Sequence, residues 1–343
     1  MRYRTLGHSG CSVSVHALGT MTFGAETDEA GSHAQLDQFV EAGGNLVDTA
    51  DVYSAGVSET IIGAWLAGDT GRRDRIVLAS KGRFPMGDGP NQVGLSRRHL
   101  DDALTASLRR LGVDTIDLYQ LHAFDPLTPL EETLRFLDDA VRAGKIRYAG
   151  LSNFTGWQVA KTVATARSAG WTVPVTLQPQ YNLLVREIEW EIVPSCLDAG
   201  LGLLPWSPLG GGWLTGKYRK DERPTGATRL GENPDRGVEA YDGRSSEQRT
   251  WDVLDELART AEAWDVSQAQ VALAWLAERP AVSSVILGAR TQTQLADNLG
   301  AADLVLTAEQ TAALDRASAP ATADYPYGGP GVDQRSRKIT GGR

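Results

Sequence analysis

The sequence predicts a (β/α)8 barrel with an N-terminal β-hairpin cap and a long insertion after its seventh strand. Eight short apolar runs alternate with amphipathic segments whose apolar residues recur every three or four positions. Strictly alternating strands and helices form parallel βαβ units, and eight such units favour a closed barrel over an open sheet. The length of 343 residues also fits one barrel with insertions. The predicted strands cover residues 17–20, 45–50, 75–80, 116–121, 146–151, 175–180, 202–207 and 283–288.

Local signals support the elements around these runs. Residues 2–7 and 12–19 flank the turn HSG, which predicts a hairpin that plugs the bottom of the barrel. Residues of N-cap type indicate where helices begin, and glycines in the stop position indicate where they end. The predicted helices include 33–44, 97–112, 130–145, 157–170 and 250–265, with caps at Ser96, Thr155 and Thr307 and stops at Gly43, Gly112, Gly144, Gly170 and Gly200.

Two segments depart from the repeat. Residues 208 to about 247 form a polar insertion that is longer than the usual loop between a strand and a helix, and we expect it to overhang the barrel mouth. Residues 318–343 are rich in Pro and Gly, which indicates an irregular tail or a flap over the pocket. The prediction is therefore one barrel domain over residues 1–317, followed by an irregular C-terminal tail.

Composition excludes several classes of partner. No apolar run approaches the roughly 18 residues of a membrane span, and the start MRYRTLGHSG lacks the apolar core of a secretory signal. We therefore expect a cytoplasmic protein without a membrane partner. A net charge of −9 argues against nucleic acid, because phosphate backbones require a basic surface. Cys11 and Cys196 form no CxxC motif, so we expect neither a disulfide framework nor a metal site.

Four polar residues follow three consecutive predicted strands: Asp48, Tyr53, Lys81 and His122. Each alone has an ordinary structural explanation, but the carboxyl ends of parallel strands meet at the mouth of a barrel, where these folds carry their chemistry. An ammonium beside a tyrosine stabilises the phenolate and lowers the tyrosine pKa, while a carboxylate holds the ammonium. An imidazole can then orient a carbonyl oxygen as it is protonated. The set can protonate a carbonyl, but it supplies no nucleophile.

Three other chemistries compete with this interpretation. Lys81 could form a Schiff base in a barrel lyase, but that role needs an amine of depressed pKa rather than one paired with Asp48. Residues 211–217 match the spacing GxxxxGK of a phosphate loop, yet Tyr218 follows where Ser or Thr would bind magnesium. No GxGxxG motif occurs, so a Rossmann dinucleotide domain has no support.

Several motifs, in one order over residues 1–317, resemble those of the aldo-keto reductases. They are DTADVYSAGVSE, ASKGR, LHAFDPLTPLEETL, GLSNF, LQPQYNLLVRE, PWSPLGGGWLTGKY and VILGARTQTQLADN. The histidine motif resembles the bacterial and potassium-channel β-subunit branches in particular. The resemblance implies that hydride from NADPH is the missing nucleophile. It also implies that Tyr53 is the general acid, that Lys81 with Asp48 lowers its pKa, and that His122 orients the carbonyl.

The resemblance further implies an NADP site and a substrate pocket. Nicotinamide would be held by Ser152, Asn153, Gln178 and Trp206, with Thr20, Met21 and Asp48 also in the cofactor site. The phosphates and adenosine would be held by Ser207, Pro208, Leu209, Gly210, Gly212, Lys217, Gly288, Arg290, Gln294, Asp297 and Asn298. Arg290 favours NADP over NAD, because a guanidinium before a helix N-terminus suits the 2′-phosphate. The substrate pocket would be lined by Phe23, Tyr53, Phe84, His122 and Phe124.

The expected function is NADPH-dependent reduction of an aldehyde or ketone to an alcohol, with a small carbonyl compound as the partner. The alternative is a cofactor-binding regulatory subunit of the channel β-subunit type with little turnover. The acidic chain offers no signal of its own for such a partner.

Overall fold

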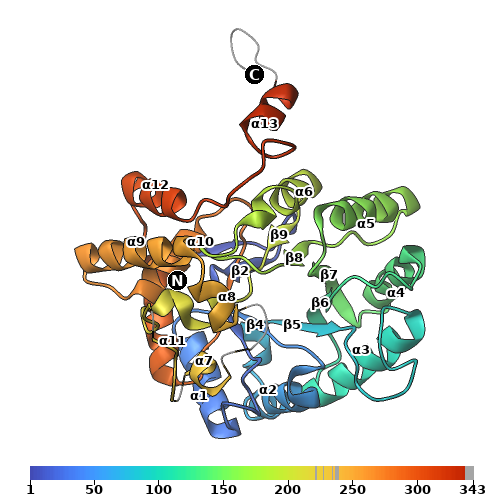
Figure 1. The fold of residues 1–343 in the computed structure, drawn as a ribbon. Helices are drawn as coiled ribbons and strands as arrows, with labels where there is room; N and C mark the ends of the chain where they lie inside the picture. Colours follow the sequence, from blue (N-terminus) through green and yellow to red (C-terminus); the bar gives the residue numbers. More distant parts are fainter. Residues whose placement is uncertain (221, 227, 234, 236–238, 337–343) are drawn as a thin grey trace.

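The computed structural model describes residues 1–220, 222–226, 228–233, 235 and 239–336. Eight parallel strands lie side by side in the order β10, β3, β4, β5, β6, β7, β8, β9. Their bounds are β3 His16–Gly19, β4 Leu46–Asp48, β5 Val77–Gly82, β6 Ile116–Leu121, β7 Ile146–Ser152, β8 Thr176–Gln178, β9 Gly202–Leu203 and β10 Val285–Leu287. Each predicted strand overlaps one of these, and the predicted (β/α)8 barrel is confirmed (Figure 1).

Backbone hydrogen bonds link the two end strands of this order. Leu203 N donates to Ala281 O (2.7 Å), and Ile286 N donates to Pro205 O (3.0 Å). The sheet therefore curls until β9 meets the segment that leads into β10. Two of the predicted strands end early because Pro179 and Pro205 have no N–H to continue the ladder.

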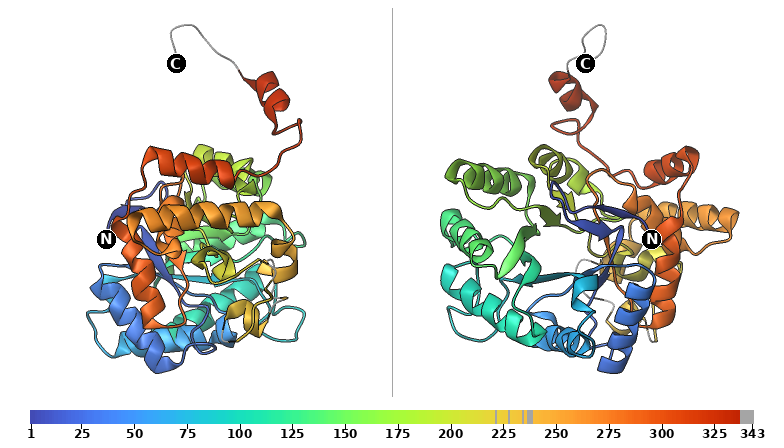
Figure 2. Two further views of the ribbon diagram at one scale, coloured as in Figure 1. Left: turned by 60° about the vertical axis from the view of Figure 1, so that its left-hand side comes forward. Right: turned by 180° about the vertical axis from the view of Figure 1, so that it is seen from behind.

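The N-terminal hairpin closes the bottom of the barrel, as predicted. Strands β1 Tyr3–Thr5 and β2 Ser12–Ser14 pair antiparallel. From the hairpin, Leu6 and Val13 join a buried apolar cluster with one residue from each of several barrel strands: Ala17, Leu46, Ala79, Leu118 and Ile286. The hairpin lies in front of the barrel when the molecule is seen from behind (Figure 2). An apolar layer thus fills the lower barrel and leaves the opposite end for polar groups.

Helices surround the barrel (Figures 1 and 2). Those between successive strands are α1 Glu29–Glu41, α2 Val57–Ala67, α3 Arg97–Leu111, α4 Leu130–Arg142, α5 Gly156–Ala169, α6 Ile192–Ala199 and α10 Gln268–Ala277, followed after β10 by α11 Gln292–Leu299. Helix α9 Gln248–Trp264 packs on α10 and on α12 Ala308–Ala317. Among the helices that the structure describes, none is long and apolar enough to span a bilayer.

Several predicted helix caps form. Ser96 Oγ accepts from His99 N, and Thr307 makes a capping box with Gln310. Gly112, Gly170 and Gly200 are left-handed C-caps, whereas Gly43 and Gly144 lie one residue beyond the C-caps Ala42 and Ala143. These local contacts depend only on nearby residues, which is why the sequence predicts them.

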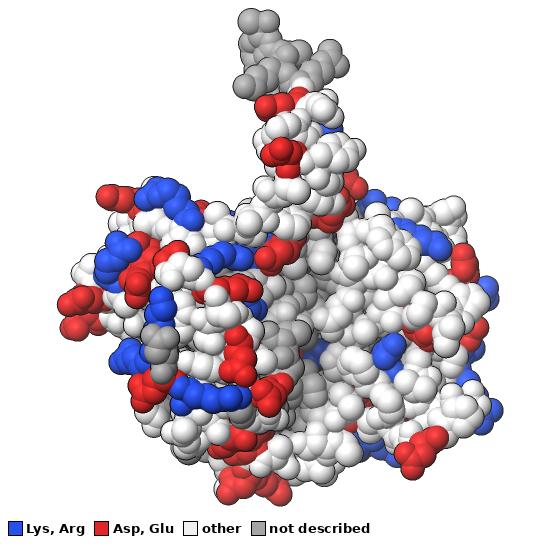
Figure 3. Space-filling view, viewed as in Figure 1, with Lys and Arg blue, Asp and Glu red and all other residues white. Residues whose placement is uncertain are grey.

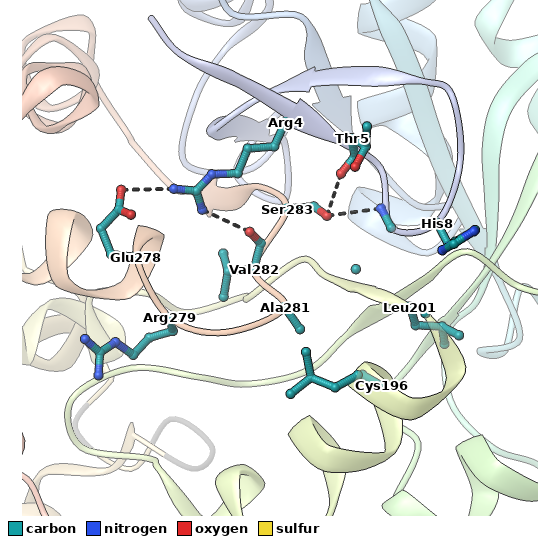
Figure 4. Close-up of a pocket in the computed structure, with 14 residues that line it drawn as sticks. Arg4, Thr5, His8, Cys196, Leu201, Glu278, Arg279, Ala281, Val282 and Ser283 are labelled. Carbon is teal, nitrogen blue, oxygen red and sulfur yellow. Dashed lines mark hydrogen bonds and ion pairs between the residues drawn. The ribbon is translucent and has the colours of Figure 1, made fainter. Parts of the chain in front are cut away.

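A surface cavity of about 650 Å³ lies beside the hairpin, at the opposite end from the barrel mouth (Figure 4). Arg4 forms an ion pair with Glu278 (2.9 Å), and Ser283 Oγ donates to Thr5 O (2.8 Å). The apolar side of the cavity is formed in part by Leu197, which is more than half exposed. The groups around it are mainly those that fasten the hairpin to the barrel.

The polar insertion after β9 contains short helices as well as loops. Its described part forms the 3-10 helix η4 Gly210–Thr215 and the short helices α7 Arg229–Glu232 and α8 Tyr241–Ser245. Residues 221, 227, 234 and 236–238 of the predicted insertion lie outside the described residues. In Figure 1, helices α7 and α8 lie to the left of the labelled barrel strands.

The described part of the C-terminal tail contains helix α13 Gly329–Arg335, which projects away from the barrel (Figures 1 and 2). Tyr327 stacks on Trp190 (ring centroids 5.4 Å) and donates to Glu191 Oε1 (2.6 Å). In this arrangement the described part of the tail, up to residue 336, contacts the barrel beside α6 and does not cover the mouth. Residues 337–343 lie outside the described residues.

Candidate active site

A polar layer lies directly above the apolar layer inside the barrel. Side chains two positions apart on a strand face the same side. On each of three strands, an apolar residue that faces the interior is followed two positions later by a polar residue that faces the same way. The pairs are Leu46 and Asp48, Ala79 and Lys81, and Leu118 and Gln120. All three polar side chains are buried.

The centre of this layer is the ammonium of Lys81, which is fully buried. Its Nζ donates to Asp48 Oδ2 (2.6 Å), to Thr49 O (2.9 Å) and to Tyr53 OH (3.1 Å). A buried charge is tolerated only when it is paired and its hydrogen-bonding capacity is used. Here all three N–H donors have partners, so the structure brings together Asp48, Lys81 and Tyr53 as the sequence predicts.

Two amides complete the environment of the Asp48 carboxylate. Its Oδ1 accepts from Gln178 Nε2 (2.9 Å) and from Gln120 Nε2 (3.1 Å). Gln120 was not among the predicted site residues. Its signal in the sequence is a polar residue within an apolar strand, two positions before His122 and hence on the same face. Both glutamines hold the carboxylate toward Lys81.

The protonation states follow from burial and charge. Burial lowers the pKa of Lys81, but the Asp48 carboxylate and Tyr53 outweigh it and raise that pKa above its usual value. Burial raises the pKa of the half-buried Tyr53, and the Lys81 charge only partly opposes the rise. The expected net lowering of the Tyr53 pKa is therefore not found in this structure. At neutral pH the site holds an ammonium and a neutral phenol.

His122 follows β6 and faces the same pocket. Its ring lies edge-on to Tyr53 (centroids 5.9 Å) and to Phe84 (4.5 Å). Burial, together with the positive charges of Lys81 and Arg83, lowers the pKa of His122 to about 2. The imidazole is thus neutral, with one N–H that can donate to a substrate oxygen.

The predicted nicotinamide-binding residues lie beside this set, on and after β7 to β9. Asn153, which has a left-handed backbone (φ 57°), donates from Nδ2 to His122 O (2.9 Å) and accepts at Oδ1 from Trp206 Nε1 (3.0 Å). Ser152 is buried, and its Oγ donates to Gln178 O (2.9 Å). One amide therefore connects the Trp206 indole to the backbone of His122, the residue that follows β6.

The two predicted cofactor residues after β3 differ in exposure. Thr20 is fully buried, and its Oγ1 donates to Asp48 O (3.0 Å). Met21 is 39 % exposed. Thr20 fixes the end of β4, and Met21 offers a surface at the mouth.

Cations gather on the other side of the mouth. Lys217 follows η4, and burial together with the charges of Arg290 and Arg229 lowers its pKa. Gly212 makes room for the Lys217 chain, because a Cβ there would lie 2.5 Å from Nζ. Three basic residues near one another, beside a glycine-rich turn, form a place for an anion such as a phosphate.

Among these cations, Arg290 is tied to the insertion. It makes a two-pronged ion pair with Glu232 in α7 (2.8 and 3.2 Å) and lies 3.8 Å from Glu26. Its backbone N donates to Gln294 Oε1 (2.8 Å). The insertion thereby reaches across to the loop between β10 and α11.

The remaining residues of the predicted phosphate and adenosine site are placed around this region. Ser207, with φ 52°, donates from Oγ to Glu239 (2.9 Å). Two others are engaged within the fold: Asp297 accepts from Ser267 and Gln270, and Asn298 is buried and donates to Gly288 O (3.3 Å). Pro208 and Gly210 are buried and Leu209 is half-buried.

Glu239, from the insertion, was not predicted. It accepts from Gln180 (2.6 Å) as well as from Ser207, and its backbone O accepts from Trp213 Nε1 (3.1 Å). These contacts join residues far apart in the chain, and one acid in a polar insertion carries no sequence signal for them. Glu239 holds the insertion against the end of the barrel.

The predicted substrate pocket needs one correction. Phe84 and Phe124 are half-buried at the mouth, but Phe23 is completely buried in the hydrophobic core and offers no surface to a ligand. Trp157, at the start of α5, is 58 % exposed and packs edge-on against Phe124 (5.7 Å). Trp157 thus extends the aromatic wall that Phe124 begins.

Comparison with known proteins agrees with this geometry. The family model for the aldo/keto reductase family matches residues 17–319. The chain belongs to the aldo/keto reductase family. This membership confirms the resemblance carried by the sequence motifs, and it makes the protein an oxidoreductase that acts on small molecules with a nicotinamide cofactor.

Individual relatives cover nearly the whole chain. An uncharacterized oxidoreductase, YrpG, of Bacillus subtilis (strain 168) is 39 % identical, over 90 % of this chain and 93 % of its own length. A probable voltage-gated potassium channel subunit beta of Oryza sativa subsp. japonica is 37 % identical (89 % and 92 %). A versiconal hemiacetal acetate reductase of Aspergillus parasiticus is 34 % identical (93 % and 98 %). The relatives thus include both enzymes and a channel subunit.

Proposed function

We propose that this protein reduces an aldehyde or ketone to an alcohol with NADPH, and that Tyr53 delivers the proton. The observation that carries the proposal is the Lys81 ammonium, which bonds Asp48 and Tyr53 at once beside the neutral ring of His122. The family supports carbonyl reduction in general. The choice of NADPH and the roles of individual residues are our inference.

The residues at the mouth fit an NADP molecule. Trp206 offers an aromatic ring for the nicotinamide, and Ser152, Asn153 and Gln178 supply amide and hydroxyl groups beside it. The phosphates would be held by Lys217 and Arg290, whose positive charges lie close enough to affect each other. When bound, the cofactor supplies the hydride.

Tyr53 is suited to donate a proton as negative charge develops on a carbonyl oxygen. Its raised pKa keeps the phenol protonated at neutral pH, so a proton is available. Lys81, 3.1 Å from the phenol oxygen, stabilises the phenolate that remains after the transfer. Asp48 keeps Lys81 charged and in place.

His122 would orient the substrate. A neutral imidazole can donate one hydrogen bond to the carbonyl oxygen without competing for the proton that Tyr53 gives. Because the pKa of His122 is lowered to about 2, the ring stays neutral over the physiological range. The carbonyl would thus be held between Tyr53 and His122.

A Schiff-base mechanism has less support. Lys81 uses all three of its N–H donors, and its pKa is raised rather than lowered, so it lacks the free amine that imine formation needs. The regulatory alternative is kept because a probable channel β subunit is among the relatives. Both functions would use the same cofactor site.

The test is the loss of NADPH absorbance when the purified protein meets a panel of aldehydes, ketones and keto-sugars. We expect steady, enzyme-dependent oxidation of NADPH with at least one carbonyl compound, and much slower oxidation of NADH. Tight binding of NADPH with no turnover across the panel would favour the regulatory alternative. Failure to bind NADPH would contradict both.

A further inference from the structure

Arg83 is a positive charge at the barrel mouth that contacts neither the cofactor nor the carbonyl in the proposed reaction, although it contributes, after burial and Lys81, to the lowered pKa of His122. It follows the last residue of β5 and comes two positions after Lys81. Its guanidinium Cζ lies 5.1 Å from the Phe84 ring centroid, and Phe84 is 4.5 Å from the ring of His122. Arg83 therefore lies beside the place where the carbonyl would bind.

The Arg83 side chain makes no close ion pair with an acidic residue among the residues that the structure describes. No side-chain hydrogen bond of Arg83 is found there either, and its Nε is buried without a partner. Its charge does reach Asp125: although burial opposes the change, hydrogen bonds from Thr128, Leu95 and Leu127 and the charge of Arg83 lower the pKa of Asp125. Asp125, in the same group of loops, is already occupied: it accepts from Leu95 N (2.8 Å), Thr128 Oγ1 (2.6 Å) and Leu127 N (3.0 Å). A half-buried guanidinium whose donors have no hydrogen-bonded acceptor is unfavourable, which leaves it available to an anion from outside.

The backbone of Arg83 adds a second observation. Its φ of 154° is a value that residues with a Cβ rarely adopt. The carbonyl of Arg83 accepts from Gly94 N (2.9 Å), so the loop holds this conformation in place. Strained non-glycine residues that persist at a mouth are characteristic of ligand sites.

We propose that Arg83 binds an anionic group of the substrate, so that the preferred substrates are carbonyl compounds that also carry a carboxylate. This inference rests on the proposed function. A single planar guanidinium matches a carboxylate with two parallel hydrogen bonds. Phe84 contacts both the Arg83 guanidinium and the His122 ring, so a substrate that reaches both would carry its carboxylate and its carbonyl an aromatic ring or a short carbon chain apart.

Charge on the rest of this face agrees with the assignment. Much of the wall beside the hollow, opposite the insertion, is free of charged side chains (Figure 3). At the same mouth, the rings of Phe124 and Trp157 pack edge-on against each other. An anionic substrate would therefore meet the Arg83 guanidinium beside a mainly uncharged wall.

The test compares matched substrates that differ in charge. Wild-type protein and the variants Arg83→Gln and Arg83→Lys are assayed with NADPH on 4-carboxybenzaldehyde and its neutral methyl ester, and on succinic semialdehyde and butanal. We expect Arg83→Gln to lower kcat/KM for the two acids by roughly 10- to 100-fold, the size of a lost charge-assisted hydrogen bond, and to leave the neutral substrates within about threefold. Arg83→Lys should retain part of the preference. Glyceraldehyde 3-phosphate against glyceraldehyde tests whether a phosphate can replace the carboxylate.

Two controls keep the outcomes distinct. Arg98→Gln removes an exposed charge on α3 and should change neither class of substrate. Activity on the ester shows that each variant is folded. An equal loss on acids and neutral compounds in Arg83→Gln, or no preference for acids in the wild type, would overturn this inference while leaving carbonyl reduction intact. If the wild type turns over no carbonyl compound, the proposed function fails first.

Discussion

At the scale of single residues, the site depends on how Lys81 is compensated. The ammonium is fully buried, and three oxygens share its charge: one from Asp48, one from Thr49 and the phenol of Tyr53. The phenol bond is the longest of the three, at 3.1 Å, and it is the one that would strengthen as the phenol becomes a phenolate. A hydrogen bond that strengthens as charge develops stabilises the transition state of the reaction more than its ground state.

The first prediction concerns Tyr53. Tyr53→Phe removes the proton donor and keeps the ring, so kcat should fall by roughly 100-fold or more, which is typical for loss of a general acid. NADPH affinity should stay nearly unchanged, because the hydroxyl acts on the carbonyl. Steady-state kinetics and a fluorescence titration with NADPH measure the two quantities. Tyr325→Phe, in an exposed part of the tail, is the control. A Tyr53→Phe protein with near wild-type turnover would refute the mechanism.

The second prediction concerns Arg290. If its guanidinium binds the 2′-phosphate, Arg290→Ala should weaken NADPH binding by roughly tenfold or more and leave NADH within about twofold. The ion pair between Arg290 and Glu232 should reduce the size of this loss, because the Glu232 carboxylate already neutralises part of the Arg290 charge. Arg316→Ala, at an exposed position in α12, is the matched control. Equal weakening of both cofactors would contradict the 2′-phosphate assignment.

At the scale of elements, β5 and β6 pack closely at the end of the barrel that carries the site. A Cβ on Gly82, the last residue of β5, would overlap the hydroxyl of Tyr119 on β6. That hydroxyl is buried and has no hydrogen-bond partner among the described residues. The absence of a side chain at Gly82 therefore leaves room for the Tyr119 hydroxyl, although this hydroxyl forms no hydrogen bond with the described residues.

The third prediction tests this contact. Gly82→Ala should lower the free energy of unfolding by about 1–3 kcal/mol through overpacking. Tyr119→Phe alone should be neutral or stabilising, because an unpaired buried hydroxyl is removed, and the double variant should recover most of the loss. Urea unfolding measures all three.

The control for this cycle is Tyr181→Phe. Tyr181 is equally buried, but its hydroxyl donates to Glu189 Oε1 (2.7 Å), so its removal should destabilise the protein. If the double variant is no more stable than Gly82→Ala, the overlap is not the cause.

The elements also show what the sequence could predict. Barrel strands carry apolar residues on both faces, and caps such as Ser96 and Thr307 use contacts three residues away, so local patterns suffice. Short helices α7 and α8 depend on packing against distant segments. Contacts of Glu239 with Gln180 and Ser207 join residues that no local pattern relates.

The same limit applies within the site. Asp48, Lys81 and His122 could be predicted because each is a polar residue at the end of an apolar strand. Arg83 could not, because an arginine after a strand is usually solvated, and only the structure shows that its Nε is buried without a partner. Phe23 was misplaced because exposure depends on packing between the loop after β3 and the core.

At the scale of the whole molecule, the charge at the barrel mouth is opposite in sign to the net charge of the chain. The chain carries a net charge of −9, yet Arg83, Lys217 and Arg290 lie around the end of the barrel that holds the site. Many other charges are paired on the outer surface, where such pairs contribute little. Local cations in an acidic protein can attract a phosphorylated cofactor and an anionic substrate without general affinity for nucleic acid.

The stability of the whole molecule should depend on pH through Asp51. This side chain is fully buried, and neither of its oxygens has a hydrogen-bond partner of normal geometry among the described residues. Burial, reinforced by the negative charge of Glu59, raises the pKa of Asp51 from 3.8 to about 7. Above pH 3.8 the unfolded chain releases this proton, while the folded protein keeps it until about pH 7. Stability from this group is therefore complete below pH 3.8 and lost as the pH rises to 7.

The fourth prediction follows from that sign. Asp51→Asn replaces the carboxyl with an amide that does not titrate. The free energy of unfolding of the variant should therefore increase relative to that of the wild type as the pH rises. Each pKa unit corresponds to about 1.4 kcal/mol, so the difference in free energy of unfolding should shift by about 2–3 kcal/mol in favour of Asp51→Asn between pH 5 and pH 8. Reversible urea unfolding at the two pH values measures it. Asp255→Asn, at an exposed position in α9, should give a constant difference. A difference for Asp51→Asn that does not change with pH would mean that Asp51 is ionised in the folded protein, with a water or a cation beside it.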